Sequence, residues 1–371
     1  MAIHIPGPQG GAARIAIVGA GPVGCASVAL LARAGHAPAL WSPTGRHLLR
    51  EGERASFICT GALQGEVQAQ WLPSPESLRE FDTVLVCLPA TAYAPVLGPL
   101  NALWRPGQHV VVSGALSLLP LWILAQATGA QGRLRVSGWG TTLTTAHFLA
   151  DGRLHLNPAR DRIDMATVGS ASAGDDCTAI FGPRFAVADN LLAPALANIN
   201  PIAHAAEVIP NLTRMDRGEQ WSLFAHFGPV VARMAEDLDA ERRAVGAALG
   251  IALPSLRQHY ARSYHVPEQA LDGMAASMVA KGMSPHGPAR LDHRYVLEDA
   301  PFGLAFLEAV AALAQVPTPV LNACLTVLGS AYGRDLRAEN FLLDALGLAA
   351  SDPASLLARC TAAENAATLV R

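Results

Sequence analysis

The amino-acid sequence predicts an α/β domain with a doubly wound sheet over residues 1–189, followed by an all-α domain over residues 190–371. Three observations support this division. A glycine-rich turn joins an apolar run to a helical run near the N-terminus, β-branched runs recur up to residue 137, and helical spacing of apolar residues dominates after about residue 190. A chain of 371 residues is also long enough for two domains of ordinary size.

The first elements are a strand at residues 14–19 and a helix at residues 25–34, with Gly35 as its C-terminal cap. A second short apolar run follows at residues 37–41. Strand, turn, helix and strand therefore succeed one another in under 30 residues, and the turn reads Gly19-Ala20-Gly21-Pro22-Val23-Gly24.

This glycine spacing is typical of a Rossmann-type dinucleotide-binding domain. Gly19 permits the tight turn, Gly21 lets a pyrophosphate approach the backbone, and Gly24 lets the helix pack closely on the sheet. The helix N-terminus then presents free N–H groups to the phosphates, and Pro22 and Val23 of the turn are further candidate cofactor contacts. The alternative is a glycine turn in an α/β domain that binds no nucleotide.

The end of the second strand predicts which nicotinamide cofactor binds. An NAD site usually carries Asp or Glu here, and that carboxylate would repel a 2′-phosphate. This chain has no acid at the position, and it places Ser42, Thr44 and Arg46 there instead. The pattern favours NADP(H); the alternative for Arg46 is a solvated loop arginine.

Further strands are predicted at residues 83–88, 108–112 and 133–137, and short strands are expected beyond residue 150. Ligands of open α/β sheets bind beyond the carboxyl ends of the strands. Leu88 and Pro89, at the end of one such strand, are therefore candidate cofactor contacts.

The second half predicts helices at residues 229–249, 301–315, 318–332 and 338–347. Two domains of different character predict a small-molecule site in a cleft between them.

Composition excludes several classes of protein. The formal net charge of -3 argues against a nucleic-acid partner. Residues 83–104 and 106–132 carry no charge, but Pro and Gly interrupt both, which predicts buried elements and no membrane partner. The 6 cysteines show no CxxC spacing, so no metal site or redox motif is expected. With no signal-peptide pattern at the N-terminus, a cytoplasmic protein is expected.

Candidate reactive residues gather in three segments of the helical half. Asn200 and His204 lie one turn apart if a helix begins near Pro201. Each also has a structural interpretation, because Asn200 and Asp299 make good helix caps and Arg294 could form a simple ion pair with Asp299. The segments are Asn198–His204, Asn211–Arg214 and Arg294–Pro301.

The set of motifs NINPIAH, DAER followed by ALG, RYVLEDAP, Thr318-Pro319 and LGL at residues 346–348 resembles the opine dehydrogenase family of the octopine/nopaline type. The resemblance implies a nucleotide-binding domain joined to a helical substrate domain. It implies reduction of the imine formed between an amino acid, or another amine, and a 2-keto acid.

The resemblance also assigns roles to residues. His204 and Asp299 match the catalytic pair, and Asn200 matches a nearby asparagine. Arg294 matches an arginine that binds a substrate carboxylate, and Asn211 is a further candidate for substrate binding. Histidine suits proton transfer near neutral pH, and a carboxylate on its other nitrogen fixes the tautomer. The sequence departs from many relatives in having no acidic residue at 137–142 and a changed aromatic segment at 223–227.

Two other functions remain open. One is an NADP-dependent 2-hydroxyacid dehydrogenase of the ketopantoate-reductase kind; those enzymes resemble one another in using a catalytic lysine, and the only lysine here is Lys281. The other is a non-catalytic protein that senses NADP. A homodimer is possible in each case.

Overall fold

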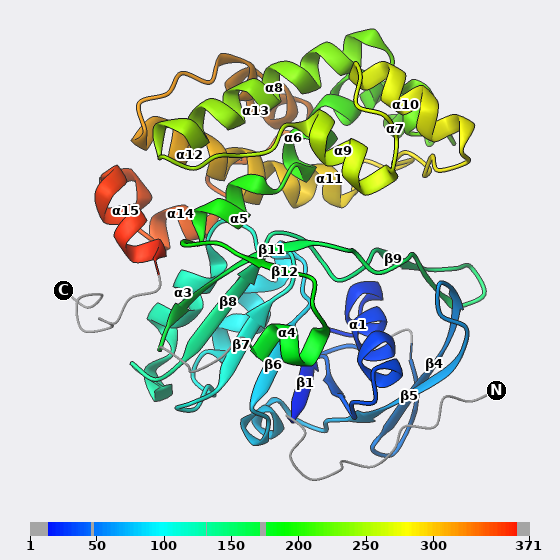
Figure 1. The fold of residues 1–371 in the computed structure, drawn as a ribbon, viewed down its shortest axis with the longest axis vertical. Helices are drawn as coiled ribbons and strands as arrows, with labels where there is room; N and C mark the ends of the chain where they lie inside the picture. The colour runs from blue at the N-terminus through cyan, green and yellow to red at the C-terminus, as the bar shows by residue number, and fades with distance from the viewer. Residues whose placement is uncertain (1–13, 46–47, 131, 171–175, 362–371) are drawn as a thin grey trace. The chain divides into compact units, whose positions relative to one another are not determined.

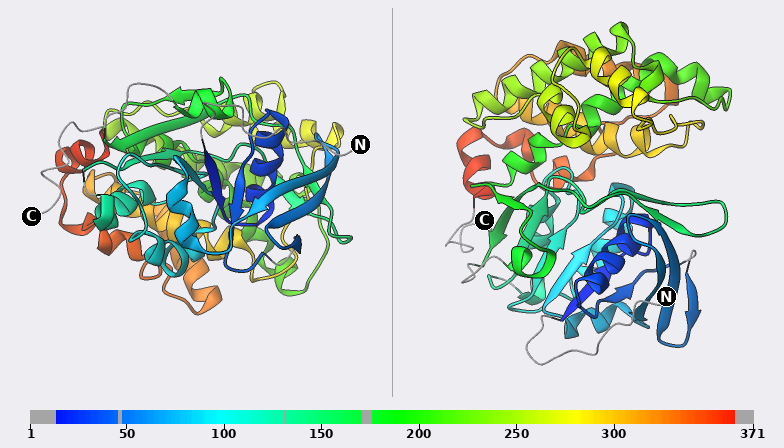
Figure 2. Two further views of the ribbon diagram at one scale, coloured as in Figure 1. Left: turned by 90° about the horizontal axis from the view of Figure 1, so that it is seen from below. Right: turned by 45° about the vertical axis from the view of Figure 1, so that its right-hand side comes forward.

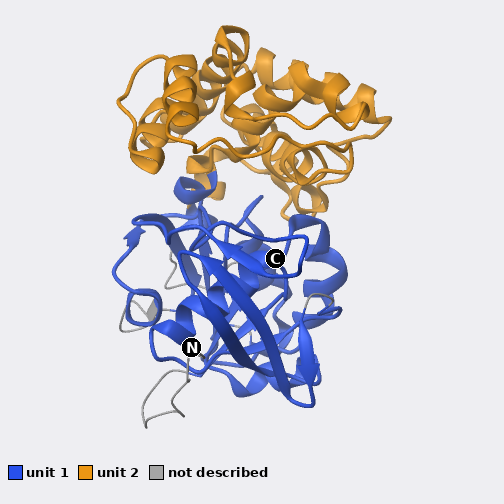
Figure 3. Cartoon of the chain, turned by 90° about the vertical axis from the view of Figure 1, so that its right-hand side faces the viewer, with its two compact units in different colours: residues 1–195, 358–371 blue, residues 196–357 orange. Residues whose placement is uncertain are grey.

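The computed structural model describes residues 14–45, 48–130, 132–170 and 176–361. The chain divides into two compact units (Figure 3). Unit 1 runs to Ala195 and includes the segment from Ala358 onward, and unit 2 spans Leu196–Leu357. This division lies six residues after the predicted boundary at 189.

The chain also returns to unit 1 at its end, which the sequence analysis did not predict. The backbone N–H of Leu191 donates to the carbonyl of Cys360 at 2.8 Å, and Asn190 forms a β-bridge with Thr361. These backbone contacts attach the end of α15 (Pro353–Cys360) to unit 1. The end of α15 therefore belongs to unit 1, although the sequence analysis placed it in the helical domain.

Unit 1 contains, among its described residues, a mixed sheet of 12 strands (Figure 1). The strands are β1 (Ile15–Val18), β2 (Ala39–Trp41), β3 (Leu49–Glu51), β4 (Arg54–Gly61), β5 (Gly65–Trp71), β6 (Thr83–Val86), β7 (His109–Val112), β8 (Arg135–Trp139), β9 (Ala146–Phe148), β10 (Leu154–Leu156), β11 (Ile163–Gly169) and β12 (Phe185–Val187).

The centre of the sheet is parallel, in the order β8-β7-β6-β1-β2-β5. Strands β1, β6 and β7 are buried along their whole length, as parallel strands covered on both faces should be. Strand β2 pairs with β1 on one side, and β6 pairs with β1 on the other. The direction in which the chain adds strands therefore reverses at β1. In α/β sheets, ligands bind beyond the carboxyl ends of the strands at such a reversal.

The predicted α/β class is confirmed, and the sheet is more mixed than a doubly wound sheet usually is. Strands β3, β4 and β5 form an antiparallel set in place of a crossover helix. The antiparallel pair β9–β10 extends the sheet beyond β4 and packs against α1, as the two views of Figure 2 show.

The helices of unit 1 are short apart from α1. They are α1 (Pro22–Arg33), α2 (Gly98–Leu100), α3 (Leu119–Gln126), α4 (Asp176–Phe181) and α5 (Leu192–Ala197), with shorter or wider turns η1 (Pro75–Glu80), η2 (Ala90–Ala92), η3 (Tyr93–Leu97) and η4 (Thr128–Ala130).

Unit 2 is helical throughout its described elements. They are α6 (Asn200–Val208), η5 (Ile209–Asn211), α7 (Leu212–Asp216), η6 (Phe224–His226), α8 (Pro229–Ala248), α9 (Leu256–Tyr264), α10 (Leu271–Ala280), α11 (Arg294–Leu297), η7 (Ala300–Leu304), α12 (Ala305–Leu313), α13 (Pro319–Tyr332), α14 (Phe341–Ala345) and η8 (Leu348–Ala350), before α15. Within the described ranges, no helix combines the length and the apolar character needed to cross a bilayer.

The long helix α8 holds unit 2 together through the DAER motif. Arg242 is 1% exposed, and its guanidinium pairs with Asp239 at 2.6 Å and donates to the carbonyls of Leu196 and Pro254. Glu241 accepts from the backbone N–H groups of Val320 and Leu321, and so caps the N-terminus of α13. This motif of the family pattern is therefore structural.

Candidate active site

The glycine loop adopts a geometry that only glycine permits at two positions. Gly19 has φ of +110°, and a Cβ there would lie 2.4 Å from the carbonyl oxygen of Cys87. A Cβ on Gly24 would lie 1.8 Å from the carbonyl oxygen of Gly19. These two residues let α1 pack against the loop and the end of β6.

Gly21 differs, because a Cβ there would meet nothing within 4 Å. It caps α1 in an extended conformation, and the first helical bond of α1 runs from the N–H of Cys25 to its carbonyl at 3.0 Å. The N–H groups of Val23 and Gly24 precede that bond and have no acceptor within the helix. Open space beside free N–H groups and the positive end of a helix fits a pyrophosphate.

The loop after β6 lies next to this turn. The side chain of Leu88 comes within 3.2 Å of the position that a Cβ on Gly19 would take, and Leu88 is half-buried. Pro89 follows it and is exposed. Both therefore lie at the carboxyl end of β6, beside the glycine loop, where a dinucleotide would pass.

The residues after β2 carry no acid. Ser42 is half-buried and Thr44 is exposed, whereas Arg46 lies outside the described residues. One contact here was missed by the sequence analysis: the Arg50 guanidinium lies 4.9 Å from the ring centroid of Trp71. A Cβ on Gly45 would lie 2.8 Å from that same ring, so a cation sits close to the loop that follows β2.

In unit 2 the structure brings together the predicted pair, 95 positions apart in sequence. The Nδ1–H of His204, on α6, donates to Oδ2 of Asp299 at 2.7 Å. His204 is 9% exposed and Asp299 is 1% exposed. Asp299 stands at the N-cap position of η7 but makes no capping hydrogen bond with its side chain, and its Oδ2 accepts from His204.

The environment of His204 favours a neutral imidazole. Burial lowers its pKa, and the Asp299 carboxylate opposes that shift. Since Nδ1 carries the proton toward Asp299, Nε2 is left with a lone pair. A neutral histidine with a carboxylate behind it can accept a proton at Nε2 and hold the resulting imidazolium.

An aromatic stack fixes the plane of this imidazole. Tyr295, on α11, lies parallel to the His204 ring, with 3.4 Å between centroids and an angle of 10°. His293 meets Tyr295 edge-on at 4.5 Å, and its Nδ1 accepts from the backbone N–H of Tyr295. The sequence analysis gave Tyr295 no role, because stacking depends on the approach of two separate helices.

A glycine allows the close approach of α6 and η7. A Cβ on Gly303 would lie 2.2 Å from Cγ of Pro201. His204 is one turn beyond Pro201, and Asp299 immediately precedes η7. The missing side chain at Gly303 therefore contributes to the distance between the two catalytic candidates.

Arg294 lies beside the pair, and its side chain is half-exposed, at 51%. Its nearest carboxylate oxygens are those of Glu298 at 3.5 Å and Asp299 at 3.8 Å, both longer than a good hydrogen bond. The predicted ion pair with Asp299 is thus loose. Such a guanidinium can still take a substrate carboxylate in its fork.

The two asparagines lie at opposite ends of α6. Asn200 is the first residue of α6 and not its N-cap; Ile199 already has helical backbone angles, and the side chain of Asn198 accepts from the N–H of Asn200. Asn200 is nevertheless one turn from His204. Asn211 is buried beyond the other end of α6, and its amide donates to the carbonyl of Glu207 at 2.8 Å.

Glu207 is a second carboxyl group in this cluster, three residues after His204 on α6. It is 3% exposed, and burial raises its pKa to about 8. The spacing His-x-x-Glu on one helix face was the available sequence signal.

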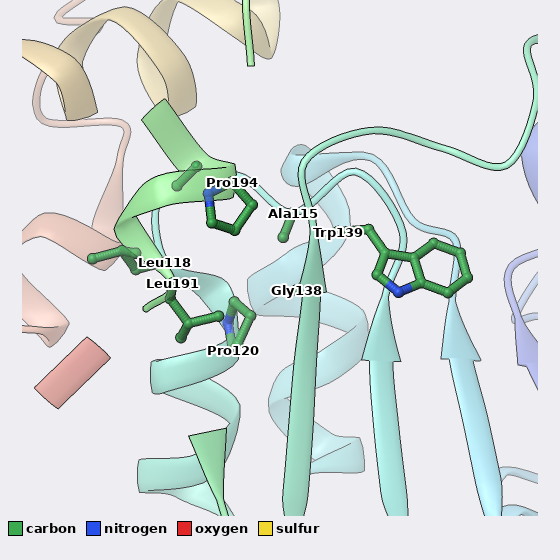
Figure 4. A pocket seen from close by; sticks show the side chains of 8 residues that line it. Ala115, Leu118, Pro120, Gly138, Trp139, Leu191 and Pro194 are labelled. Atoms are coloured by element: carbon green, nitrogen blue, oxygen red, sulfur yellow. The ribbon is translucent and has the colours of Figure 1, made fainter. Parts of the chain in front are cut away.

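Two other features of the structure lie apart from this cluster. A small hollow in unit 1 is lined only by apolar or small residues, so it offers no group for proton transfer (Figure 4). Those residues are Ala115, Leu118, Pro120, Gly138, Trp139, Leu191, Pro194 and Ala195. Within the described part of the chain, no group of three or more His, Cys, Asp or Glu side chains could hold a metal ion.

The chain joins a Rossmann-type unit, which carries the glycine loop, to a helical unit, which carries the His204–Asp299 pair. This combination defines the class of protein as an NAD(P)-dependent oxidoreductase. Residues 187–332 match the family described as NAD/NADP octopine/nopaline dehydrogenase, alpha-helical domain, and residues 15–113 match the family described as ketopantoate reductase PanE/ApbA. The resemblance to the opine dehydrogenases is therefore confirmed, because the helical part of the chain matches their family model.

Individual relatives agree with this assignment. An opine dehydrogenase of Arthrobacter sp. (strain 1C) is 26% identical over 345 residues, which is 90% of this chain and 94% of that protein. A structure of octopine dehydrogenase in complex with NADH and agmatine has a TM-score of 0.77, with 15% identity over 95% of this chain and 100% of that one. Yersinopine dehydrogenase with NADP+ bound has a TM-score of 0.67, with 17% identity over 94% and 97% of the two chains.

Proposed function

We propose that the protein catalyses the NADP(H)-dependent reduction of the imine formed between a 2-keto acid and the amino group of an amino acid or another amine. The observation that carries the proposal is the buried His204–Asp299 pair with the half-exposed side chain of Arg294 beside it. This reaction needs two groups from the protein: one that transfers protons and one that binds a carboxylate.

His204 moves the proton in this proposal. An amine arrives protonated at neutral pH, and it must lose a proton before its lone pair attacks the keto carbon. His204 accepts that proton at Nε2, and Asp299 stabilises the imidazolium. After water leaves, the nitrogen of the reduced imine takes up a proton, which His204 returns. A nicotinamide dinucleotide, when bound at the glycine loop, supplies the hydride.

Arg294 orients the substrate. Its guanidinium fork matches a carboxylate in two hydrogen bonds, and both the keto acid and an amino acid carry a carboxylate. Asn200, one turn from His204, is the candidate for a hydrogen bond to the reacting groups, and Asn211 remains a candidate for substrate binding. Whether the site lies between the two domains also remains a prediction.

NADPH is proposed over NADH because residues 41–45 contain no carboxylate to repel a 2′-phosphate. Ser42 and Thr44 can donate hydrogen bonds, and Arg46 supplies positive charge. Replacing Arg46 with Ala should weaken NADPH binding more than NADH binding, measured by fluorescence titration. Arg50→Ala is the companion variant, since its cation also lies near this loop. Equal losses for both cofactors would remove the preference.

The decisive experiment follows NADPH consumption by absorbance, with NADH in parallel. Pyruvate, 2-oxoglutarate and oxaloacetate are each combined with a panel of amino acids and amines. Consumption that needs both a keto acid and an amine supports imine reduction and identifies the pair. No consumption with any pair, although NADPH binds, would favour the non-catalytic sensor.

The match of residues 15–113 to ketopantoate reductases supports a second candidate, a 2-hydroxyacid dehydrogenase. That reaction would consume NADPH with a keto acid alone. The structure gives Lys281 another partner, because its ammonium donates to the carbonyl of His265 at 2.6 Å on the surface. Full loss of turnover in a folded Lys281→Ala variant would favour this second candidate.

The remaining parts of the proposal concern the partners, the cellular location and the oligomeric state. We propose small-molecule substrates as the partners and the cytoplasm as the location, since the 6 cysteines are buried and form no disulfide. The proposed homodimer is tested by light scattering.

A further inference from the structure

His293 occupies the N-cap position of α11, the short helix that carries Tyr295. Its Nδ1 accepts from the backbone N–H of Tyr295 at 3.4 Å, and its carbonyl accepts from the N–H groups of Val296 and Leu297, each at 3.1 Å. His293 therefore satisfies three N–H groups at the start of the helix. Since a helix this short has no stability of its own, its orientation depends on such anchors.

The side chain of His293 does more than a usual helix cap. Ser, Thr, Asp and Asn are the common caps, and they supply an acceptor and little else. His293 supplies an acceptor and also a ring, which meets the ring of Tyr295 edge-on with 4.5 Å between centroids and an angle of 87°. The preceding carboxylate, Asp292, is bonded to Arg290 through both oxygens at 2.8 Å. His293 thus holds Tyr295 at two points, the backbone and the ring.

The surroundings of His293 keep it neutral. Burial is the largest influence, and it lowers the pKa of His293 to about 4. At pH 7 its Nδ1 therefore keeps the lone pair that accepts from the helix N–H. A neutral ring also adds no positive charge to the groups that act on it electrostatically, which are His204, Arg294, Asp299 and Asp292.

Tyr295 in turn stacks on His204, with 3.4 Å between ring centroids and an angle of 10°. The hydrogen bond from Nδ1 of His204 to Asp299 fixes the position of one ring atom. It does not by itself fix the plane of the ring, and the lone pair of Nε2 lies in that plane. Proton transfer needs this lone pair directed at the proton it accepts. The stack therefore supplies a constraint that the hydrogen bond lacks.

We infer that His293 is a positioning residue for the reaction proposed above: it holds Tyr295, by the backbone and by the ring, in the orientation that sets the plane of the His204 imidazole. His293 acts through Tyr295 and contacts no reacting atom. The inference rests on the proposed function only where turnover is measured.

The first test needs no turnover. The ring-proton signals of His204 are recorded by NMR in cofactor-free protein and assigned with His204→Gln. The face of the Tyr295 ring shifts these signals, and Tyr295→Leu gives the full size of that effect. In His293→Ala we expect the signals to move part of the way toward their positions in Tyr295→Leu. Unmoved signals in folded His293→Ala would overturn the inference.

His226→Ala is the matched control for this measurement. His226 also lies in unit 2 and also meets an aromatic ring edge-on, that of Trp221, with 5.6 Å between centroids. We expect the His204 signals of this variant to stay at their wild-type positions. If His226→Ala moves them as far as His293→Ala does, the inference is wrong.

The second test uses the rate. The kcat of His293→Ala should fall about 10- to 100-fold, since a misplaced proton-transfer group can cost as much. KM for the keto acid and NADPH affinity should stay within about threefold of wild type, because binding common to the ground state and the transition state is retained. A raised KM with an unchanged kcat would mean that His293 contacts the substrate itself, and it would overturn the inference.

Two further variants separate the two contacts of His293. His293→Asn keeps a side-chain acceptor for the helix N–H and loses the ring, whereas His293→Phe keeps the ring and loses the acceptor. Each should recover part of the kcat that His293→Ala loses, and recovery by neither would contradict the proposed role. If His293→Ala does not fold, wild-type NMR signals and rates in both of these variants would overturn the inference.

Failure of this inference can be distinguished from failure of the proposed function. If the wild-type protein turns over no pair of keto acid and amine, the proposed function fails. The NMR signals of His204 still decide whether His293 sets the plane of its ring.

Discussion

At the scale of single residues, the role proposed for His204 depends on its surroundings, which differ from those of His226. His204 is buried against Asp299, whereas His226 is partly exposed and its Nδ1 is bonded to the carbonyl of Ser222. His204→Gln should lower kcat by about 10²–10⁴-fold, because a general acid–base group contributes that much. NADPH affinity should stay nearly intact. His226→Gln is the matched control, and equal losses in the two variants would contradict the assignment.

Tyr295 tests whether the stack against His204 matters for proton transfer. Tyr295→Phe keeps the ring and should retain most activity. Tyr295→Leu keeps an apolar side chain against the His204 ring. It removes the attraction between the aromatic ring face and the imidazolium. We expect it to lower the acidic pKa of the kcat profile by up to about one unit. An identical pH profile in both variants would limit Tyr295 to packing.

The residue types of the catalytic pair could be predicted from sequence, because a family pattern linked His204 to Asp299 across 95 positions. Tyr295 and Gly303 could not be predicted in the same way. Their roles depend on which faces of α6, α11 and η7 meet, and periodicity within one helix carries no information on its neighbours.

At the scale of elements, substitutions in the glycine loop should affect either stability or cofactor binding, depending on the position. A Cβ on Gly24 would overlap the Gly19 carbonyl, so Gly24→Ala should destabilise unit 1 by about 1–3 kcal/mol or more. Gly21→Ala meets nothing within 4 Å and should keep its melting temperature. Its NADPH affinity should fall roughly 10-fold or more, because the methyl group occupies space for the pyrophosphate. Calorimetry measures the change in stability, and fluorescence titration measures NADPH affinity. A Gly21→Ala variant that binds NADPH as tightly as wild type would refute the predicted pyrophosphate site.

The contact of η7 with α6 gives a second element-scale prediction. Gly303→Ala would push a methyl group into Pro201 and so move Asp299 away from His204. We expect a loss of stability of about 1–3 kcal/mol and a larger fall in kcat than in NADPH affinity. Gly228→Ala, where a Cβ meets nothing within 4 Å, serves as the control. Similar kinetics for both variants would show that Gly303 does not set the distance.

Element types were predicted well where burial alone determines them. The parallel strands β6 and β7 are continuous apolar runs, and their positions agree with prediction within a few residues. The strands β3–β5 were missed, because an alternating pattern on a partly exposed sheet is weak. The helix predicted from residue 301 begins with the wider turn η7, since Asp299 is bonded to His204 and does not cap it.

At the scale of the whole molecule, the two units should respond to pH in opposite senses. His109, in unit 1, is 4% exposed, and burial lowers its pKa to about 3. The unfolded chain binds a proton there that the folded unit does not, so acidification below the ordinary value of 6.5 removes stability. Glu207, in unit 2, has its pKa raised from 4.5 to about 8, so the folded unit keeps a proton that the unfolded chain loses as pH rises.

Each group should therefore contribute up to about 1.4 kcal/mol per pH unit, with opposite sign, between its two pKa values. Compared with wild type, His109→Gln should gain stability as pH falls from 6.5 to 4, and Glu207→Gln should gain stability as pH rises from 4.5 to 8. Calorimetry at half-unit pH steps measures both slopes. Because the groups belong to different units, any separate unfolding transitions should each respond to only one variant. A pH slope unchanged by either substitution would show that the buried group titrates normally.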